Sequence, residues 1–138
     1  MSKPDMSDAL QDALRAIPGL VSAYLFGSAA TGREHRESDV DVAVLVDRAA
    51  YPTAAERFEL RLTVSTALHQ AAARDVDLVI LNDTPPQFAR RIMTEGYRLL
   101  SNDAQQEHAH LRMVLSRAAD LEPFLRRTRA IKLQAVER

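Results

Sequence analysis

The chain has 138 residues, of which 46% are hydrophobic and 27% are charged, and this balance is typical of a globular domain in water. It has no cysteine, which excludes disulfide bonds and thiolate metal sites. It also has no apolar segment long enough to span a membrane and no signal-peptide profile at its N-terminus, so we expect a cytoplasmic protein with no membrane partner. The length fits one domain over residues 1–138.

The net charge of −1 conceals an uneven distribution along the chain. Residues 1–110 contain 11 Lys and Arg against 16 Asp and Glu, whereas residues 111–138 contain 7 against 3. A basic C-terminal segment after an acidic body is either a surface for a partner or a solvated helix packed on its own domain, and composition leaves both open. A chain this close to neutrality is not expected to take nucleic acid as its direct substrate.

The first predicted elements are a short helix and a buried strand. A helix capped by Ser7 or Asp8 runs to about residue 16, and Pro18-Gly19 ends it. The apolar run 20–26 follows and is typical of a buried strand.

Gly27 and Ser28 end this strand and form the first candidate binding element. A glycine at such a turn lets backbone N–H groups approach an anion closely, and the adjacent hydroxyl adds a donor. We therefore expect both residues to bind a phosphate group. The alternative for Gly27 is an ordinary turn glycine.

A second apolar run, residues 39–46, carries two acids at its start. Side chains alternate along a strand, so Asp39 and Asp41 project to the same face about 6.5 Å apart. Two neighbouring carboxylates at the head of a hydrophobic strand repel each other and lose hydration, and a divalent cation such as Mg²⁺ removes that conflict. Nucleotidyl transfer requires hydrogen-bond donors to the phosphates beside a metal site. The alternative for the two acids is that they lie in a solvated turn and at the edge of a strand.

The rest of the chain is predicted to form, in order, a helix, a strand, a helix, a strand and a helix. The expected ranges are 53–73, 76–81, 87–95 ended by Gly96, an edge strand at 97–100, and a helix from 103 onward. Phe88 and Ile92 are expected on one apolar face of the short helix, and Pro123 is expected to kink or interrupt the last helix. The predicted fold is α+β, with a small mixed sheet of about four strands and helices packed against it. Its core covers about 7–101, and a C-terminal helical segment covers about 103–136.

The pattern Gly27-Ser28, ten residues, then Asp39-x-Asp41 resembles the signature of the DNA polymerase β-like nucleotidyltransferase superfamily. With the short length, it is similar to the minimal nucleotidyltransferase (MNT) antitoxins that are paired with HEPN-domain toxins. The resemblance implies the polymerase β-like fold. It also implies a third acid at the head of the next strand, which completes a catalytic and metal-binding trio with Asp39 and Asp41 around two Mg²⁺ ions. Asp77 is the favoured candidate because an apolar run follows it directly, while Asp75 competes because spacing alone places both on one face.

The same resemblance implies ATP as a substrate, with Gly27 and Ser28 binding its outer phosphates. Ser38 is a further nucleotide-binding candidate, and its alternative role is to orient the carboxylate of Asp39. Relatives often carry arginines directly after the serine, whereas Arg33 and Arg36 are the nearest cations here.

The function implied by the resemblance is a Mg²⁺-dependent protein adenylyltransferase. It would transfer AMP from ATP to a hydroxyl group, that of a tyrosine, on a cognate HEPN ribonuclease toxin and so act as the antitoxin. The basic C-terminal segment and the acidic body would then form the docking surface. The alternatives are a small-molecule enzyme similar to aminoglycoside nucleotidyltransferases, for which the chain is short, a non-catalytic toxin-binding module, and an enzyme with a nucleic-acid acceptor.

Overall fold

Four strands form one mixed sheet in the computed structural model, which describes residues 6–27 and 39–137, with side chains as far as Thr128. The strands are β1 (Leu20–Phe26), β2 (Val40–Val46), β3 (Val76–Ile80) and β4 (Tyr97–Ser101), and their order in the sheet is β3-β2-β1-β4. β2 and β3 are parallel, whereas β1 runs antiparallel to both β2 and β4. The predicted mixed sheet and the edge position of its last strand are confirmed.

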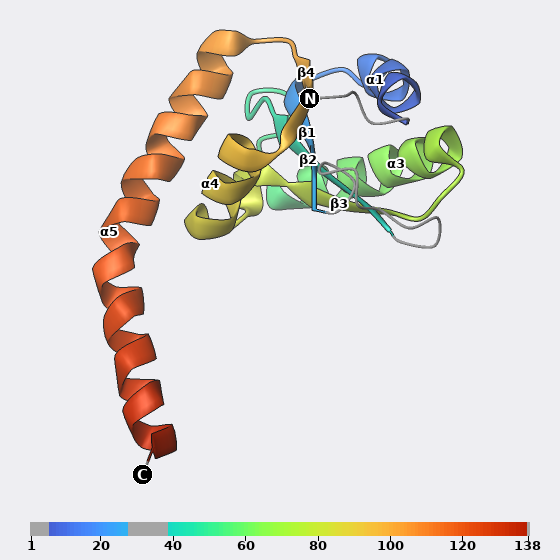
Figure 1. The fold of residues 1–138 in the computed structure, drawn as a ribbon. Helices are drawn as coiled ribbons and strands as arrows, with labels where there is room; N and C mark the ends of the chain where they lie inside the picture. Colours follow the sequence, from blue (N-terminus) through green and yellow to red (C-terminus); the bar gives the residue numbers. More distant parts are fainter. Residues whose placement is uncertain (1–5, 28–38, 138) are drawn as a thin grey trace.

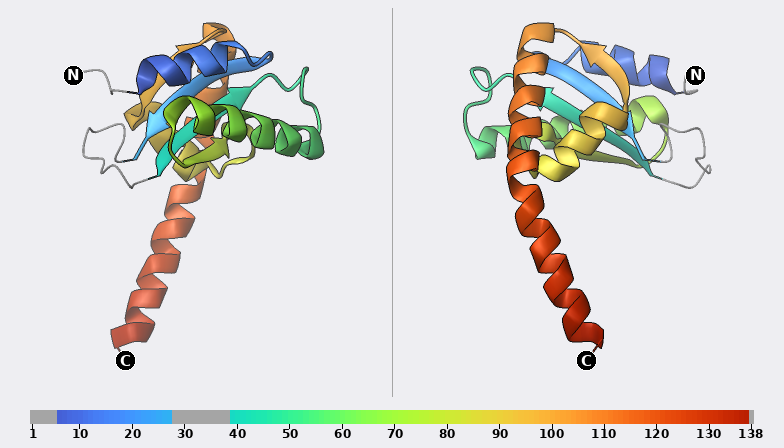
Figure 2. Two further views of the ribbon diagram at one scale, coloured as in Figure 1. Left: turned by 90° about the vertical axis from the view of Figure 1, so that its right-hand side faces the viewer. Right: turned by 60° about the vertical axis from the view of Figure 1, so that its left-hand side comes forward.

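Helices cover both faces of this sheet (Figures 1 and 2). They are α1 (Ser7–Arg15), α3 (Ala54–Ala72), a 3₁₀ turn η1 (Leu81–Asp83), α4 (Pro86–Glu95) and α5 (Ala104–Glu137). α1 and α3 pack on one face, while α4 and the first half of α5 pack on the other. No helix in the described part of the chain is long and apolar enough to cross a membrane.

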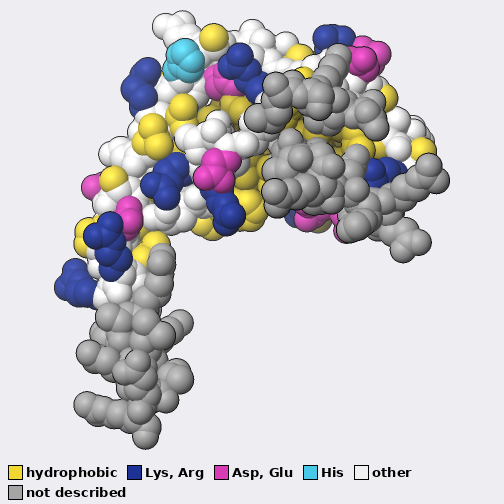
Figure 3. Space-filling view, in the orientation of Figure 1, with side chains coloured by type: hydrophobic (Ala, Val, Ile, Leu, Met, Phe, Trp, Pro, Cys, Tyr) yellow, Lys and Arg dark blue, Asp and Glu magenta, His cyan; other side chains and the backbone are white. Residues whose placement is uncertain are grey.

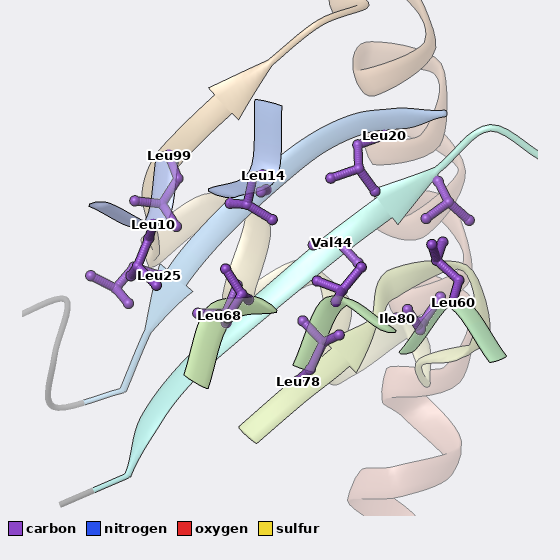
Figure 4. Close-up of a cluster of buried hydrophobic side chains, with 14 of the residues drawn as sticks. Leu10, Leu14, Leu20, Leu25, Val44, Leu60, Leu68, Leu78, Ile80 and Leu99 are labelled. Atoms are coloured by element: carbon purple, nitrogen blue, oxygen red, sulfur yellow. The ribbon is translucent and has the colours of Figure 1, made fainter. Parts of the chain in front are cut away.

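Alternation along β2 divides the core between the two faces of the sheet. The even-numbered valines of β2, from Val40 to Val46, face α1 and α3 in a cluster of buried leucines and valines (Figure 4). Ala43 and Leu45 face the opposite way, toward α4 and α5. The odd-numbered side of β2 also includes Asp41, so this carboxylate belongs to the face that α4 and α5 cover.

Two predictions about the helices differ from the structure, one about the N-cap of α1 and one about Pro123 inside α5. The N-cap of α1 is Met6, which makes no side-chain capping hydrogen bond, so the predicted caps Ser7 and Asp8 lie inside the helix. The hydroxyl of Ser7 is buried within this helix, where it is not in a position to cap the first N–H groups. Of the two outcomes predicted for Pro123, an interruption of the last helix is wrong, because α5 is continuous to Glu137, and a kink stays a prediction. Because Pro123 is exposed, the carbonyl that it leaves without an N–H donor is accessible to water.

α5 extends well beyond the domain that it packs against. Val114 and Ala118 of α5 are buried against the domain, but no side chain from residue 119 to residue 128 is buried. Figures 1 and 2 show the helix continuing away from the sheet after this point. Its second half is therefore a projecting rod rather than part of the core.

Candidate active site

The candidate site lies at the edge of the sheet where β1 ends and β2 and β3 begin. Asp41 is paired in Cα register with Phe26 of β1 on one side and with Asp77 of β3 on the other. Residues that lie opposite each other on neighbouring strands project to the same face, so the Asp41 and Asp77 side chains share the face of α4 and α5. Asp39 lies one residue ahead of β2. The structure thus brings the three predicted acids to one corner of the sheet.

Repulsion among these acids affects the pKa of Asp41. Burial is the largest cause that raises the pKa of its carboxyl group above the ordinary value, and the charges of Asp77 and Asp39 raise it further. Within the described residues none of the three carboxylates has a hydrogen-bond or ion-pair partner, and Asp39 and Asp77 are exposed. A concentration of negative charge with no cation paired to it in this part of the chain fits hard divalent cations, which take carboxylate oxygens as ligands.

The three carboxylates do not surround a common point in this structure. Within residues 6–27 and 39–137, no three side chains of the ligating types are close enough together to enclose an ion. Asp41 and Asp77 share a face of the sheet, and Asp39 is close enough to raise the pKa of Asp41, so the three acids fit a metal. Binding would require their side chains to turn toward one another.

Asp75 and Asp77 lie in different surroundings, although residues two apart in a strand would project to the same face. β3 begins at Val76, so Asp75 precedes the strand and does not follow its alternation. Its carboxylate lies 3.5 Å from Nδ1 of His69 on α3, which packs on the opposite face of the sheet from Asp41. The geometry therefore favours Asp77 as the third acid of the site.

Gly27 lies directly against Asp41. Its φ of +72° is in the left-handed region, and a Cβ atom built on it would be 2.6 Å from Oδ2 of Asp41. Any side chain here would push this carboxylate aside, so the position requires glycine for two reasons. Ser28 and Ser38, together with Arg33 and Arg36, lie outside the described residues, and their roles remain predictions.

An aromatic pair beside the acids was not predicted as part of the site. The rings of Phe26 and Phe88 meet edge to face, with centroids 5.7 Å apart. Helical spacing grouped Phe88 with Ile92, but Ile92 is 2% exposed whereas Phe88 is 45% exposed. Phe88 is in the first turn of α4, and no pattern in the sequence tells whether this turn covers the sheet or lies at its margin.

A family model described as polymerase beta, nucleotidyltransferase matches residues 8–105, a segment that includes all four strands and the three acids. The chain belongs to this family. The expected family resemblance and fold are thereby confirmed, and the nucleotidyltransferase match extends from α1 to the start of α5.

Similar proteins within the nucleotidyltransferase family point to a narrower group. The protein adenylyltransferase MntA of Shewanella oneidensis is 36% identical over 91 residues, which are 66% of this chain and 61% of that protein. The matched segment thus spans less than two thirds of the relative's length. A crystal structure described as a toxin-antitoxin with AMP-PNP superposes with a TM-score of 0.67 at 28% identity, covering 96% of this chain and 98% of the other. A second structure, of an MNT antitoxin with a tri-AMPylated HEPN toxin of Shewanella oneidensis, gives a TM-score of 0.58 at 25% identity, covering 96% and 97%.

Proposed function

We propose that this protein is a Mg²⁺-dependent nucleotidyltransferase that transfers AMP from ATP to a tyrosine hydroxyl of a HEPN-domain toxin and thereby acts as its antitoxin. The observation that carries the proposal is the register pairing of Asp41 with Asp77, beside Asp39 and against Gly27. The named activity of the MntA relative and the toxin-antitoxin structures support the choice of nucleotide and acceptor.

The three acids would hold the metal. Asp39 and Asp41 would bind one Mg²⁺ ion, and Asp77 would contribute to a second. When bound, the ions neutralise the triphosphate and the charge that develops on it during transfer. Asp41 is half-buried and fixed between two strands, so it is the ligand whose position the fold determines most strongly.

The remaining steps belong to residues of the chain itself. Gly27 and Ser28 would bind the outer phosphates through their N–H and hydroxyl groups. Asp77 is exposed at the sheet edge, where an incoming hydroxyl group can reach it, and would accept the proton of that hydroxyl. The acceptor oxygen then forms a bond to the α-phosphorus, while the bond from this phosphorus to pyrophosphate breaks and pyrophosphate leaves. The rate enhancement would come mainly from positioning and charge neutralisation.

The projecting half of α5 supplies a docking surface for the toxin. Leu121 and Phe124 are 40% and 60% exposed, and Arg126 and Arg127 follow them. An isolated helix in water is marginally stable, so a rod with exposed apolar side chains gains from a partner that covers it. The basic charge of residues 111–138 fits an acidic, partly apolar surface on the toxin.

The test is transfer of label from α-³²P-labelled ATP to the protein encoded by the neighbouring open reading frame, which the proposal expects to contain a HEPN domain. We expect wild type to label the toxin and Asp77→Asn to label it about 100-fold more slowly, which is typical of the loss of a general base. Asp75→Asn is the matched control, because it removes an acid two residues away that faces His69, and it should label at the wild-type rate. Absence of labelling by wild type, together with absence of ATP binding, would refute the proposal.

The contact-only alternative is distinguished by growth rescue. If Asp41→Asn protects cells from the toxin as well as wild type does, neutralisation comes from binding and not from AMP transfer. The catalytic proposal requires that this variant still bind the toxin but fail to protect.

A further inference from the structure

Phe88 is a large aromatic side chain left open to solvent beside the acids. It is 45% exposed, although Ala89 and Ile92 on the same helix are buried. We propose that Phe26 and Phe88 form an aromatic wall on which the base of the bound nucleotide stacks. This inference rests on the proposed function and names the subsite that would hold the purine of ATP.

The wall adjoins the acids through β1. Phe26 is directly opposite Asp41 in the antiparallel pair of β1 and β2, so its ring projects to the same face as that carboxylate. Gly27, the candidate phosphate-binding residue, follows Phe26 immediately. The Phe88 ring lies at 84° to the Phe26 ring. Figure 3 shows apolar side chains (yellow) at the surface beside α4, on the side of the molecule where α4 and α5 lie.

The position of Phe88 is fixed by its helix and not by the ring itself. α4 begins with Pro86 at its first position, which sets the backbone of this turn. Nε2 of Gln87 donates to the carbonyl oxygen of Ala118 on α5 at 2.9 Å and ties the start of α4 to a buried part of α5. Because the helix that carries Phe88 is already fixed, a stacking ligand has to order only the side chain, and this part of the wall is pre-organised.

Location distinguishes Phe88 from the other exposed aromatic side chains. Phe58 on α3 is 57% exposed, but α3 packs on the face of the sheet away from Asp41. Phe124 is 60% exposed on the projecting half of α5. Within the described residues, Phe88 alone of these three contacts a residue that is in register with an acid of the site.

The chemistry expected of the wall is stacking on the π-face of a base. Stacking strength follows the size of the ring system and tolerates different hydrogen-bonding patterns. The wall therefore favours purine over pyrimidine nucleotides and discriminates weakly between ATP and GTP.

The test measures binding of Mg²⁺–ATP and of Mg²⁺–tripolyphosphate, which lacks base and ribose, to the full chain by calorimetry. Phe88→Ala should bind ATP about tenfold more weakly than wild type, in line with the loss of one base–aromatic stack, and bind tripolyphosphate unchanged. Phe88→Tyr keeps a ring and should retain wild-type affinity, whereas Phe88→Leu keeps the apolar bulk and should lose it. Phe58 is an exposed phenylalanine on the other face of the sheet, so Phe58→Ala is the matched control and should bind both ligands as wild type does.

Two results with the Phe88 variants would overturn the inference. Phe88→Ala and Phe88→Leu could bind ATP as tightly as wild type does, or they could lose affinity for ATP and for tripolyphosphate to the same extent. If wild type binds tripolyphosphate but ATP no more tightly, the wall fails while the phosphate and metal site stands. If wild type binds neither ligand, the proposed function fails together with the wall.

Discussion

Asp41 carries an electrostatic cost that can be measured without any assay of transfer. Because its pKa is raised in the folded protein by burial and by Asp77 and Asp39, its ionisation opposes folding. The stability associated with the protonated carboxyl is fully present below about pH 4 and is lost as the pH rises through the raised pKa. We expect Asp41→Asn to melt at a higher temperature than wild type at pH 7, and this difference to shrink toward pH 4.

At neutral pH, Mg²⁺ should make wild type melt at a higher temperature than Asp41→Asn. A cation that binds only the folded state stabilises it in proportion to the logarithm of its concentration over Kd. In thermal melts, increasing Mg²⁺ should raise the midpoint temperature of wild type and of Asp75→Asn. It should leave the midpoint temperature of Asp41→Asn unchanged. Equal responses of wild type and Asp41→Asn would show that the cation binds elsewhere.

Substitutions of Gly27 and Gly19 distinguish a glycine that the candidate site requires from one that the fold requires. Both have a positive φ, +72° and +81°, and a Cβ on either would come within 2.6 Å of a neighbour. That neighbour is the Asp41 carboxylate for Gly27 but the ring of Tyr51 for Gly19. Gly27→Ala should lower AMP transfer about 100-fold, as expected when a reacting group is displaced by about 1 Å. Gly19→Ala should lower the melting temperature and leave transfer per folded molecule unchanged.

At the scale of single elements, a polar cluster around the buried Glu107 holds the start of α5 on the sheet. Glu107 is 4% exposed, and it accepts hydrogen bonds from the hydroxyl of Tyr24, from Oγ of Ser101 at 2.9 Å and from Nη1 of Arg98 at 3.2 Å. Burial and the bond to Glu107 raise the pKa of Tyr24 well above its ordinary value, so this phenol remains a donor at any working pH. The cluster therefore fixes the base of α5 and, through it, the direction of the projecting rod.

Removing one donor from this cluster should be costly. Tyr24→Phe leaves the buried carboxylate with one hydrogen bond fewer, which typically lowers the free energy of unfolding by about 2 kcal/mol. Asp12→Ala removes an exposed ion pair with Arg15 and should change it by less than about 0.5 kcal/mol. Denaturant melts of both variants against wild type give the comparison. A Tyr24→Phe variant as stable as wild type would show that water replaces the lost donor.

For the molecule as a whole, sequence patterns predicted the helices and strands whose residues follow a local periodicity. β1 was predicted at its observed bounds because turn residues flank an apolar run, and the second apolar run was predicted as a strand with Asp41 near its start. The choice between Asp75 and Asp77 needed coordinates, because it depends on where β3 begins relative to β2. The exposure of Phe88 also needed them, since helical spacing defines a face but not whether another element covers it.

The same limit applies to α5, whose apolar spacing is equally consistent with packing on its own domain and with contact to a partner. The structure separates the two halves of the helix, because Val114 and Ala118 are buried whereas Leu121 and Phe124 are exposed. If the exposed half docks the toxin, the double variant Leu121→Glu/Phe124→Glu should lose at least tenfold in toxin affinity, since buried apolar anchors dominate interface energies. ATP binding and the melting temperature should stay at wild-type values, because neither side chain contributes to the core.

The matched control comes from the opposite side of the molecule. Phe58 and Leu62 on α3 form an apolar pair that is 57% and 56% exposed, so Phe58→Glu/Leu62→Glu makes the same chemical change at a similar exposure. Toxin affinity measured by calorimetry should fall for the α5 variant and not for the α3 variant. Equal losses would mean that general surface charge governs the interaction, and a loss confined to the α3 variant would place the toxin on the other face. Because the first half of α5 packs on the face of the sheet that carries Asp41 and Asp77, a toxin docked along α5 would lie next to the face on which Asp77 is exposed.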